Sequence, residues 1–207
     1  MEILGSNWLS RGVKNLLIIN IAVFIAQYFF GGVMLKWFAL YPFLAGFMPW
    51  QLVTYQFMHA GFVHLFFNML CLFGIGFVVE DYFISTKEFI IFYLLCGIVG
   101  GLAQNILFID STIPMVGASG AIWGLLASLL LICPKSKLYL FFILPVTVWV
   151  LIVILFVLEL FGIFSGGGVS HACHIGGALA GIGLLYGYNK MNHWKRVSKL
   201  NNDEIIF

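Results

Sequence analysis

This chain has 207 residues, of which 62% are hydrophobic and only 9% are charged, and its mean hydropathy is +1.07. A water-soluble domain of this size could not cover its surface with so few charges, so the composition indicates an integral membrane protein. The net charge of +2 arises from basic residues in short segments between apolar runs, which leaves nucleic-acid binding without support.

The apolar runs have the length of bilayer-spanning helices, roughly 20 residues, whereas a barrel would show alternating segments of about ten. The sequence therefore predicts an all-α integral membrane protein with six transmembrane helices in one bundle. We expect the spans at residues 15–34, 57–79, 89–109, 116–133, 139–161 and 170–188. The first run follows Arg11 and Lys14 and is too long for a signal-peptide core, so we expect it to stay as a signal anchor.

Basic residues predict the orientation of these spans. With a cytoplasmic amino terminus, the inner segments hold nine of the Lys and Arg residues and the outer segments hold only Lys36. The predicted organisation is a cytoplasmic segment at 1–14, a six-helix membrane domain at 15–188 and a cytoplasmic tail at 189–207. Without further spans or a targeting sequence, we expect a prokaryotic inner membrane.

The first outer segment, residues 33–56, is too long for a tight turn. It is rich in aromatic residues, and Pro42 and Pro49 interrupt it. Aromatic side chains favour the boundary between membrane and water. We therefore expect an interfacial first outer loop in contact with the lipid bilayer.

Four polar side chains fall at one depth in the predicted topology. His64, Asn68, Ser119 and His174 all lie in the first turns of helices that begin at the outer face. His64 and Asn68 are four residues apart and so share a helix face. Polar groups inside a membrane are costly, and their convergence predicts a functional pocket.

Ser119 and His174 suggest nucleophilic catalysis. A serine hydroxyl needs a base within about 2.6 to 3.2 Å, and His174 is the candidate. Helices approach that closely only where small residues face each other, and this chain has Gly120 and Gly124 on one helix with Gly177 and Gly181 on the other. Trp123 lies one turn after Ser119, where its ring can pack against the imidazole.

A triad would need an acid near the histidine. Glu80 lies twelve residues after Asn68, roughly 18 Å along the helix axis, so the sequence predicts a Ser–His dyad. Donors for a developing oxyanion are expected from the Ser119 backbone N–H and from the side chains of His64 and Asn68.

These residues resemble the rhomboid intramembrane serine proteases over nearly the whole six-span core. The matching segments are His64-Leu65-Phe66-Phe67-Asn68, Gly117-Ala118-Ser119-Gly120, and Ala172-Cys173-His174-Ile175-Gly176-Gly177 with Gly181. The resemblance implies that Ser119 is the nucleophile, that His174 is the base and later the acid, and that His64 and Asn68 donate to the oxyanion. It also implies hydrolysis of a peptide bond in or near a transmembrane segment of a protein substrate, without a metal or organic cofactor.

The chain departs from the family pattern in the first outer loop. Trp50 matches the tryptophan of a Trp-Arg pair, but Gln51 stands where arginine is usual, so the anchoring of this loop is open. Trp123 stands where many members have tyrosine. Glu80 matches a position associated with structure, and its burial would require hydrogen-bonded partners.

Other interpretations remain for individual residues. Ser119 alone could be an N-cap or a packing residue, and His64 and Asn68 could secure the outer loop through the backbone. His59, His64, His171 and His174 invite a metal-site interpretation, but no carboxylate accompanies them in the sequence and no HExxH motif is present. The isolated cysteines are expected to be small packing residues: Cys71, Cys96, Cys133 and Cys173.

Three polar residues near the outer face, Gln104, Asn105 and Glu159, either hydrate the pocket or simply lie in the interface. The fifth span is dense in large apolar residues, with Pro145 near its inner end, which suits a loosely held lipid-facing helix. Resemblance to the family suggests a side entrance for substrate there.

Two other functions compete with a protease. One is a catalytically inactive rhomboid-like protein that binds membrane helices, and the other is a small transporter or metal carrier. Retention of both Ser119 and His174 disfavours the first, and the lack of paired intramembrane charges or repeats disfavours the second. Substrate identity and oligomeric state are not encoded in these motifs.

Overall fold

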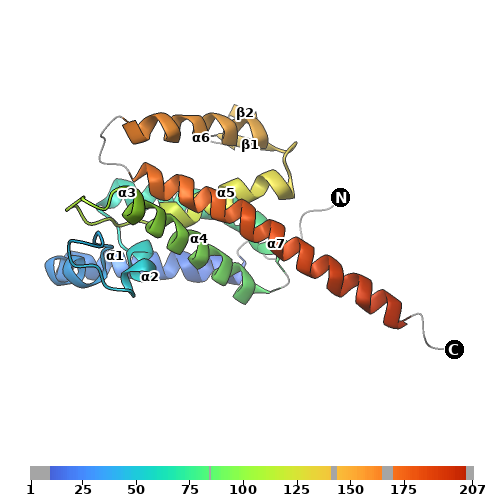
Figure 1. Ribbon diagram of the computed structural model, residues 1–207, viewed down its shortest axis with the longest axis horizontal. Coiled ribbons are helices and arrows are strands. Elements are labelled where there is room, and N and C mark those ends of the chain that lie inside the picture. The colour runs from blue at the N-terminus through green and yellow to red at the C-terminus, as the bar shows by residue number, and fades with distance from the viewer. Residues whose placement is uncertain (1–9, 84, 141–143, 165–169, 204–207) are drawn as a thin grey trace.

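Helices make up most of this protein in the computed structural model, which describes residues 10–83, 85–140, 144–164 and 170–203, without the side chains of residues 139, 140, 164 and 193–203. Two antiparallel strands are the other regular elements of the described chain (Figure 1). The elements run in the order α1 (Arg11–Phe38), α2 (Gln51–Thr54), the 3-10 turn η1 (Tyr55–Phe57), α3 (Phe62–Tyr82), α4 (Thr86–Leu107), α5 (Ser119–Ile132), β1 (Lys137–Leu140), β2 (Leu144–Thr147), α6 (Val148–Phe164) and α7 (His171–Asp203).

The helices identify a multi-pass integral membrane protein. Within the described residues, α1, α3 and α4 are long and apolar enough to cross a bilayer, and α5 and α6 are shorter apolar helices. The count of six spans therefore stays a prediction. Helices α3, α5 and α7 begin at one end of the bundle, which we call the Ser119 end.

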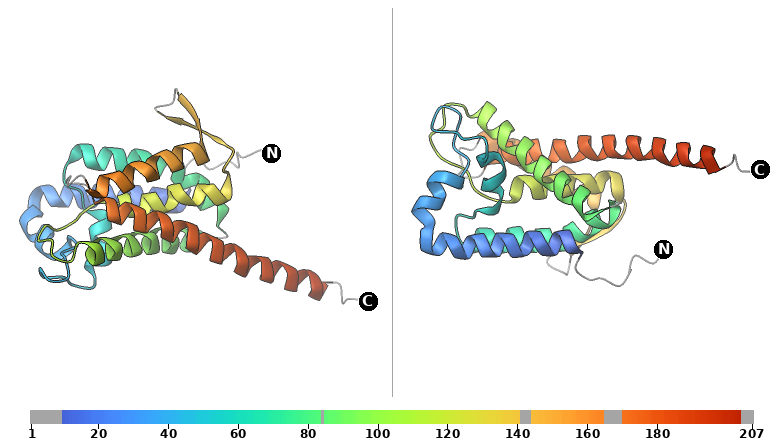
Figure 2. Two further views of the ribbon diagram at one scale, coloured as in Figure 1. Left: turned by 45° about the horizontal axis from the view of Figure 1, so that its top comes forward. Right: turned by 90° about the horizontal axis from the view of Figure 1, so that it is seen from below.

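Close contacts between glycines bring α7 against its neighbours α4 and α5 (Figures 1 and 2). A Cβ atom at Gly177 would lie 2.8 Å from the carbonyl carbon of Gly120, and one at Gly181 would lie 2.7 Å from that of Gly124. A Cβ at Gly100 of α4 would lie 2.6 Å from the carbonyl oxygen of Cys173. The predicted small-residue crossing of α5 and α7 is confirmed, and Gly100 adds a crossing of α4 and α7 that was not predicted; any larger side chain at these glycines would push the helices apart.

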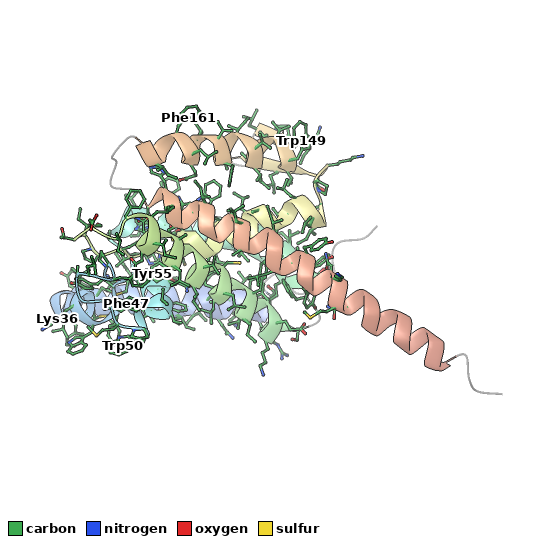
Figure 3. All side chains as sticks on the ribbon, in the orientation of Figure 1. Lys36, Phe47, Trp50, Tyr55, Trp149 and Phe161 are labelled. Atoms are coloured by element: carbon green, nitrogen blue, oxygen red, sulfur yellow. The ribbon has the colours of Figure 1, made fainter. Side chains whose placement is uncertain are left out.

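Helices α1 and α6 lie at opposite edges of the bundle in Figure 1. Helix α6 buries only one side, with Val148, Leu151 and Ile152, while Trp149 and Phe161 near its two ends are exposed and point away from the other helices (Figure 3). This exposure agrees with the expected lipid-facing fifth helix.

Buried Glu80, near the end of α3, holds the start of α1. Its carboxylate accepts hydrogen bonds from the backbone N–H groups of Gly12 and Val13, both at 2.8 Å, and from the Thr86 hydroxyl at 2.9 Å. The first N–H groups of a helix have no partner within the helix and carry partial positive charge, which a carboxylate satisfies. The expectation that a buried Glu80 needs hydrogen-bonded partners is confirmed.

The predicted fifth span begins too early. Residues 139–140 and 144–147 belong to the antiparallel pair β1–β2, in which Lys137 pairs with Thr147, and α6 starts only at Val148. Residues 141–143 of the predicted span lie outside the described residues. Pro145 explains the difference, because proline lacks an N–H donor and disfavours helix at the preceding residue, yet it fits in an edge strand.

Two other predicted limits shift. Helix α1 continues to Phe38, four residues beyond the predicted end of the first span, and α7 continues to Asp203 through most of the predicted tail. Residues 1–9 and 204–207 of the predicted terminal segments lie outside the described residues. Of the cysteines expected to pack inside, Cys96 and Cys173 are buried, whereas Cys71 is exposed and Cys133 is half-buried.

The loop between α1 and α3 is anchored by the residue that departs from the family pattern. Gln51 is fully buried, and its side-chain oxygen accepts hydrogen bonds from the backbone N–H groups of Tyr41 at 3.2 Å and Met48 at 3.1 Å. The Trp50 indole donates to the carbonyl of Trp37 at 2.9 Å. A neutral amide therefore holds this loop closed, which answers the question that the missing arginine raised.

Candidate active site

Ser119 is the first residue of α5, and the turn before it requires glycine. Gly117 has φ of +133°, a conformation that L side chains rarely adopt, and a Cβ there would lie 2.8 Å from the ring of His64. The backbone N–H of Gly117 donates to the carbonyl of Tyr55 at 3.0 Å. Gly117 thus brings the start of α5 against both α3 and the buried Tyr55.

Ser119 is not the N-cap of α5. The cap position belongs to Ala118, and no side chain caps the helix. The Ser119 hydroxyl instead lies 2.8 Å from Nε2 of His174, within hydrogen-bond distance. The structure therefore brings together the two residues that the sequence paired, and the N-cap interpretation of Ser119 does not apply.

His174 lies in the first turn of α7 and is held on its flat face. The Trp123 ring stacks on the imidazole, with ring centroids 5.6 Å apart and an interplanar angle of 24°. This contact confirms the expected packing of Trp123. Cys173 beside His174 is fully buried against Tyr55, whose hydroxyl donates to the carbonyl of Gly97 at 2.6 Å.

A carboxylate that the sequence motifs did not predict also lies at this place. Glu159 of α6 lies with one oxygen 2.9 Å from Nδ1 of His174 and the other 2.5 Å from Nδ1 of His171. The expectation that no acid accompanies the Ser119–His174 pair is therefore wrong. The available signal was a lone carboxylate in an otherwise apolar helix, since an ionisable residue inside a membrane is by default a functional candidate.

His64 and Asn68 face the same hollow as Ser119. They line a cavity of about 360 Å³ together with Ser119, Cys173 and His174. The buried side-chain nitrogen of Asn68 has no hydrogen-bond partner among the described residues. A buried donor without a partner is costly, so this amide is available to an acceptor that enters the cavity.

The ring of His64 is oriented by its neighbours. Its Nδ1 accepts a hydrogen bond of 3.4 Å from the backbone N–H of Ala60, and the His59 ring packs edge-on against it with centroids 5.1 Å apart. A neutral imidazole that accepts at Nδ1 carries its proton on Nε2. That nitrogen is on the side of Gly117 and the cavity.

A second cavity of about 430 Å³ adjoins the first and shares His64, Met115 and Val116 with it. Gln104 and Asn105 line this second cavity, and the Asn105 amide donates to the carbonyl of Tyr41 at 3.1 Å. The two cavities together form a partly polar hollow at the Ser119 end.

Glu159, His171 and His174 are the described residues that could hold a metal ion, with ligand atoms within 4.8 Å of one another. The sequence-based objection that no carboxylate accompanies the histidines therefore fails. A cation bound at Nδ1 of His174 would leave the proton on Nε2, where it would oppose acceptance of a proton from Ser119. The four histidines do not form one group, because His59 pairs with His64.

The site contains a hydroxyl beside an imidazole, a carboxylate on the other side of that imidazole, and across the cavity the Asn68 amide, a donor without a partner among the described residues. The N-terminus of α5 adds N–H groups without intrahelical acceptors at the hydroxyl itself. These are the parts that acyl transfer requires.

Comparison with known proteins gives a consistent result. Residues 46–191 match the family model for the rhomboid domain. The chain is 35% identical to rhomboid protease GluP of Bacillus subtilis (strain 168), over 64% of this chain and 25% of that protein. It is 31% identical to rhomboid-like protease 3 of Toxoplasma gondii, over 75% of this chain and 59% of that protein.

A plastid relative matches over a longer stretch. The chain is 31% identical to rhomboid-like protein 11, chloroplastic, of Arabidopsis thaliana, over 86% of this chain and 65% of that protein. The chain spans less than two thirds of the length of each of these three relatives.

Proposed function

This chain belongs to the rhomboid family, and on that premise we propose that it is an intramembrane serine endopeptidase that hydrolyses peptide bonds in or near transmembrane segments of membrane proteins. The observation that carries the proposal is the 2.8 Å distance between the Ser119 hydroxyl and Nε2 of His174. That distance lies within the range that a general base needs.

In the proposed reaction, Ser119 Oγ attacks the carbonyl carbon of the scissile peptide and its proton passes to Nε2 of His174. The carbonyl π electrons move onto the oxygen, giving a tetrahedral intermediate. His174 then donates the proton to the departing amine as the C–N bond breaks, which leaves an acyl-enzyme. Water then attacks the ester carbon while His174 takes its proton. The ester C–O bond breaks, which releases the new carboxyl end, and His174 returns the proton to Ser119 Oγ.

The negative oxygen of the intermediate requires donors. The side chain of Asn68, the Nε2–H of His64 and the first N–H groups of α5 surround the cavity at Ser119 and supply them. Removal of one such donor typically costs about 100-fold to 1000-fold in rate. No step of this reaction uses a metal or organic cofactor.

The topology is part of the proposal. We infer six membrane spans formed by α1, α3, α4, α5, α6 and α7, with Ser119 near the outer face and both termini in the cytoplasm. The excess of basic residues in the inner segments supports this orientation. Transmembrane proteins are then the substrates, and the hollow beside α6 is where their chain would enter.

The test is cleavage of a single-span membrane protein by the purified chain in liposomes. We expect a defined product that Ser119→Ala and His174→Ala abolish, together with labelling of Ser119 by a fluorophosphonate probe. The same product from Ser119→Ala would refute the assignment. Binding of the substrate without cleavage or labelling would instead indicate a catalytically inactive binder.

A further inference from the structure

Glu159 is an acidic residue in an otherwise apolar helix. Its side chain is 13% exposed, and each of its two oxygens meets a histidine of α7. Burial of a carboxylate without partners is very costly, so these two contacts are what make its position tolerable. The same contacts also act on the two histidines.

The contact with Glu159 determines which ring nitrogen of His174 carries the proton. An ionised carboxylate only accepts hydrogen bonds, so Nδ1 of His174 must carry a hydrogen to bond Glu159. A neutral imidazole has one such hydrogen, and Nε2 therefore presents a lone pair. That lone pair faces the Ser119 hydroxyl at 2.8 Å, which is the arrangement that a general base requires.

The opposite tautomer would be unfavourable on both sides of the ring. It would place the lone pair of Nδ1 against a carboxylate oxygen and would turn Nε2 into a donor toward Ser119. When His174 takes a proton from Ser119, the ring becomes a cation and the carboxylate attracts it across 2.9 Å. Glu159 therefore favours both the starting and the protonated states of the base.

We propose that Glu159 is a positioning residue for the proposed reaction: it fixes the tautomer and orientation of His174 and makes the Ser119–His174 pair a triad with an acid contributed by α6. The inference rests on the proposed function and deepens it. It assigns a role in the reaction to a helix that carries neither the nucleophile nor the base.

His171 holds the carboxylate in place. It occupies the second oxygen of Glu159, so the carboxylate cannot turn away from His174 without losing that bond. Gly162 of α6 gives the His171 ring its room, since a Cβ there would lie 2.5 Å from Nδ1 of His171. With Trp123 stacked on the face of His174, the ring is confined on its face, at Nδ1 and at Nε2.

A purely structural role is the competing explanation, because the same contacts also join α6 to α7. The two roles differ in their readouts. A contact that only joins α6 to α7 would affect protein stability and substrate access, and therefore KM. A positioning residue affects kcat and the tautomer of the His174 ring. In the established Ser–His–Asp enzymes, amidation of the acid keeps the geometry but lowers kcat about 10⁴-fold because the tautomer is wrong.

The experiment compares Glu159→Gln and Glu159→Asp with the matched control Glu88→Gln. The Glu88 carboxylate accepts a hydrogen bond of 3.0 Å from the Tyr188 hydroxyl, and Glu88 does not line the cavity at Ser119. With a transmembrane substrate, we expect Glu159→Gln to lower kcat by at least about 100-fold with KM changed less than about threefold. We expect Glu159→Asp to recover part of the rate and Glu88→Gln to act like the original chain. A kcat of Glu159→Gln within about threefold of the original, or a change in KM alone, would overturn the proposal.

A second measurement needs no activity. In Ser119→Ala protein labelled with ¹⁵N at histidine, the nitrogen shifts of His174 report which ring nitrogen carries the proton. We expect the proton on Nδ1 with Glu159 and a shift of the population toward Nε2 in the Glu159→Gln background. The same His174 tautomer with and without the Glu159 carboxylate would overturn the proposal, whatever the kinetic result. If the original chain neither cleaves a substrate nor labels at Ser119, the proposed function is overturned. The tautomer measurement then still decides whether Glu159 orients His174.

Discussion

Replacement of Gly177 by alanine should separate Ser119 from His174. Gly177 lies one helical turn after His174, and it faces Gly120, the residue next to Ser119. A Cβ at this position would lie 2.8 Å from the carbonyl carbon of Gly120 and closer still to its oxygen. Non-bonded carbon atoms prefer at least about 3.5 Å, so the two helices must move apart by at least about 0.7 Å.

That displacement is enough to break the contact on which the proposed reaction depends. Added along the line between the Ser119 hydroxyl and Nε2 of His174, it lengthens their 2.8 Å distance to about 3.5 Å or more, where a side-chain hydrogen bond is nearly lost. A misplacement of about 1 Å can cost roughly 100-fold in rate. We therefore expect fluorophosphonate labelling and substrate cleavage by Gly177→Ala to slow by about that factor.

Gly183→Ala is the matched control, because Gly183 lies on the same helix and a Cβ there meets no atom within 4 Å. It should label at the original rate. Thermal unfolding of both variants in detergent shows whether the helices still assemble. If folded Gly177→Ala labels as fast as Gly183→Ala, the glycine crossing does not set the Ser119–His174 distance and the reasoning is wrong.

Three further predictions concern other contacts. Glu80→Ala leaves the N–H groups of Gly12 and Val13 without their carboxylate acceptor and should destabilise the protein by about 3 kcal/mol, measured by reversible unfolding in mixed micelles. An effect below about 0.5 kcal/mol would contradict the capping role. Gln51→Leu removes the acceptor that closes the loop before α2 and should increase limited proteolysis of that loop, whereas an unchanged digestion rate would show that the loop is held by other contacts. Micromolar Zn²⁺ should inhibit cleavage by binding to Nδ1 of His174, and EDTA should reverse this inhibition. EDTA alone should leave cleavage unchanged, and loss of cleavage in EDTA would mean that Glu159, His171 and His174 hold a required metal.

The pairing of Ser119 with His174 could be predicted because membrane topology limits where residues lie. Helices of known length in alternating directions place their first turns at one depth, and facing glycines indicate which helices touch. The same rules predicted the contact between Trp123 and His174, since one helical turn separates Trp123 from Ser119.

Glu159 could not be placed in the same way. Its helix has no glycine motif that indicates a partner, and apolar residues surround it on every face, so hydropathy alone does not tell which side points inward. The hairpin before α6 was missed for a related reason. Hydrophobic residues continue through it without a break, and only Pro145 indicated that the helix begins later.

Gln51 shows a different limit. A comparison of motifs records that arginine is missing but not which groups a shorter amide can reach. In the structure the side-chain oxygen of Gln51 accepts from two backbone N–H groups of its own loop, so the anchor depends on an acceptor and not on a charge. Backbone partners of this kind leave no pattern in a single sequence.

The bond between Glu80 and the start of α1 also constrains how the protein is made. The two partners are 67 and 68 residues apart, so α1 leaves the ribosome long before the group that completes its first turn has been translated. During that interval the amide hydrogens of Gly12 and Val13 must be solvated by water, lipid headgroups or the insertion machinery. A nascent chain arrested ahead of residue 80 should therefore show rapid hydrogen–deuterium exchange at these amides, and the exchange should slow once α3 has been released.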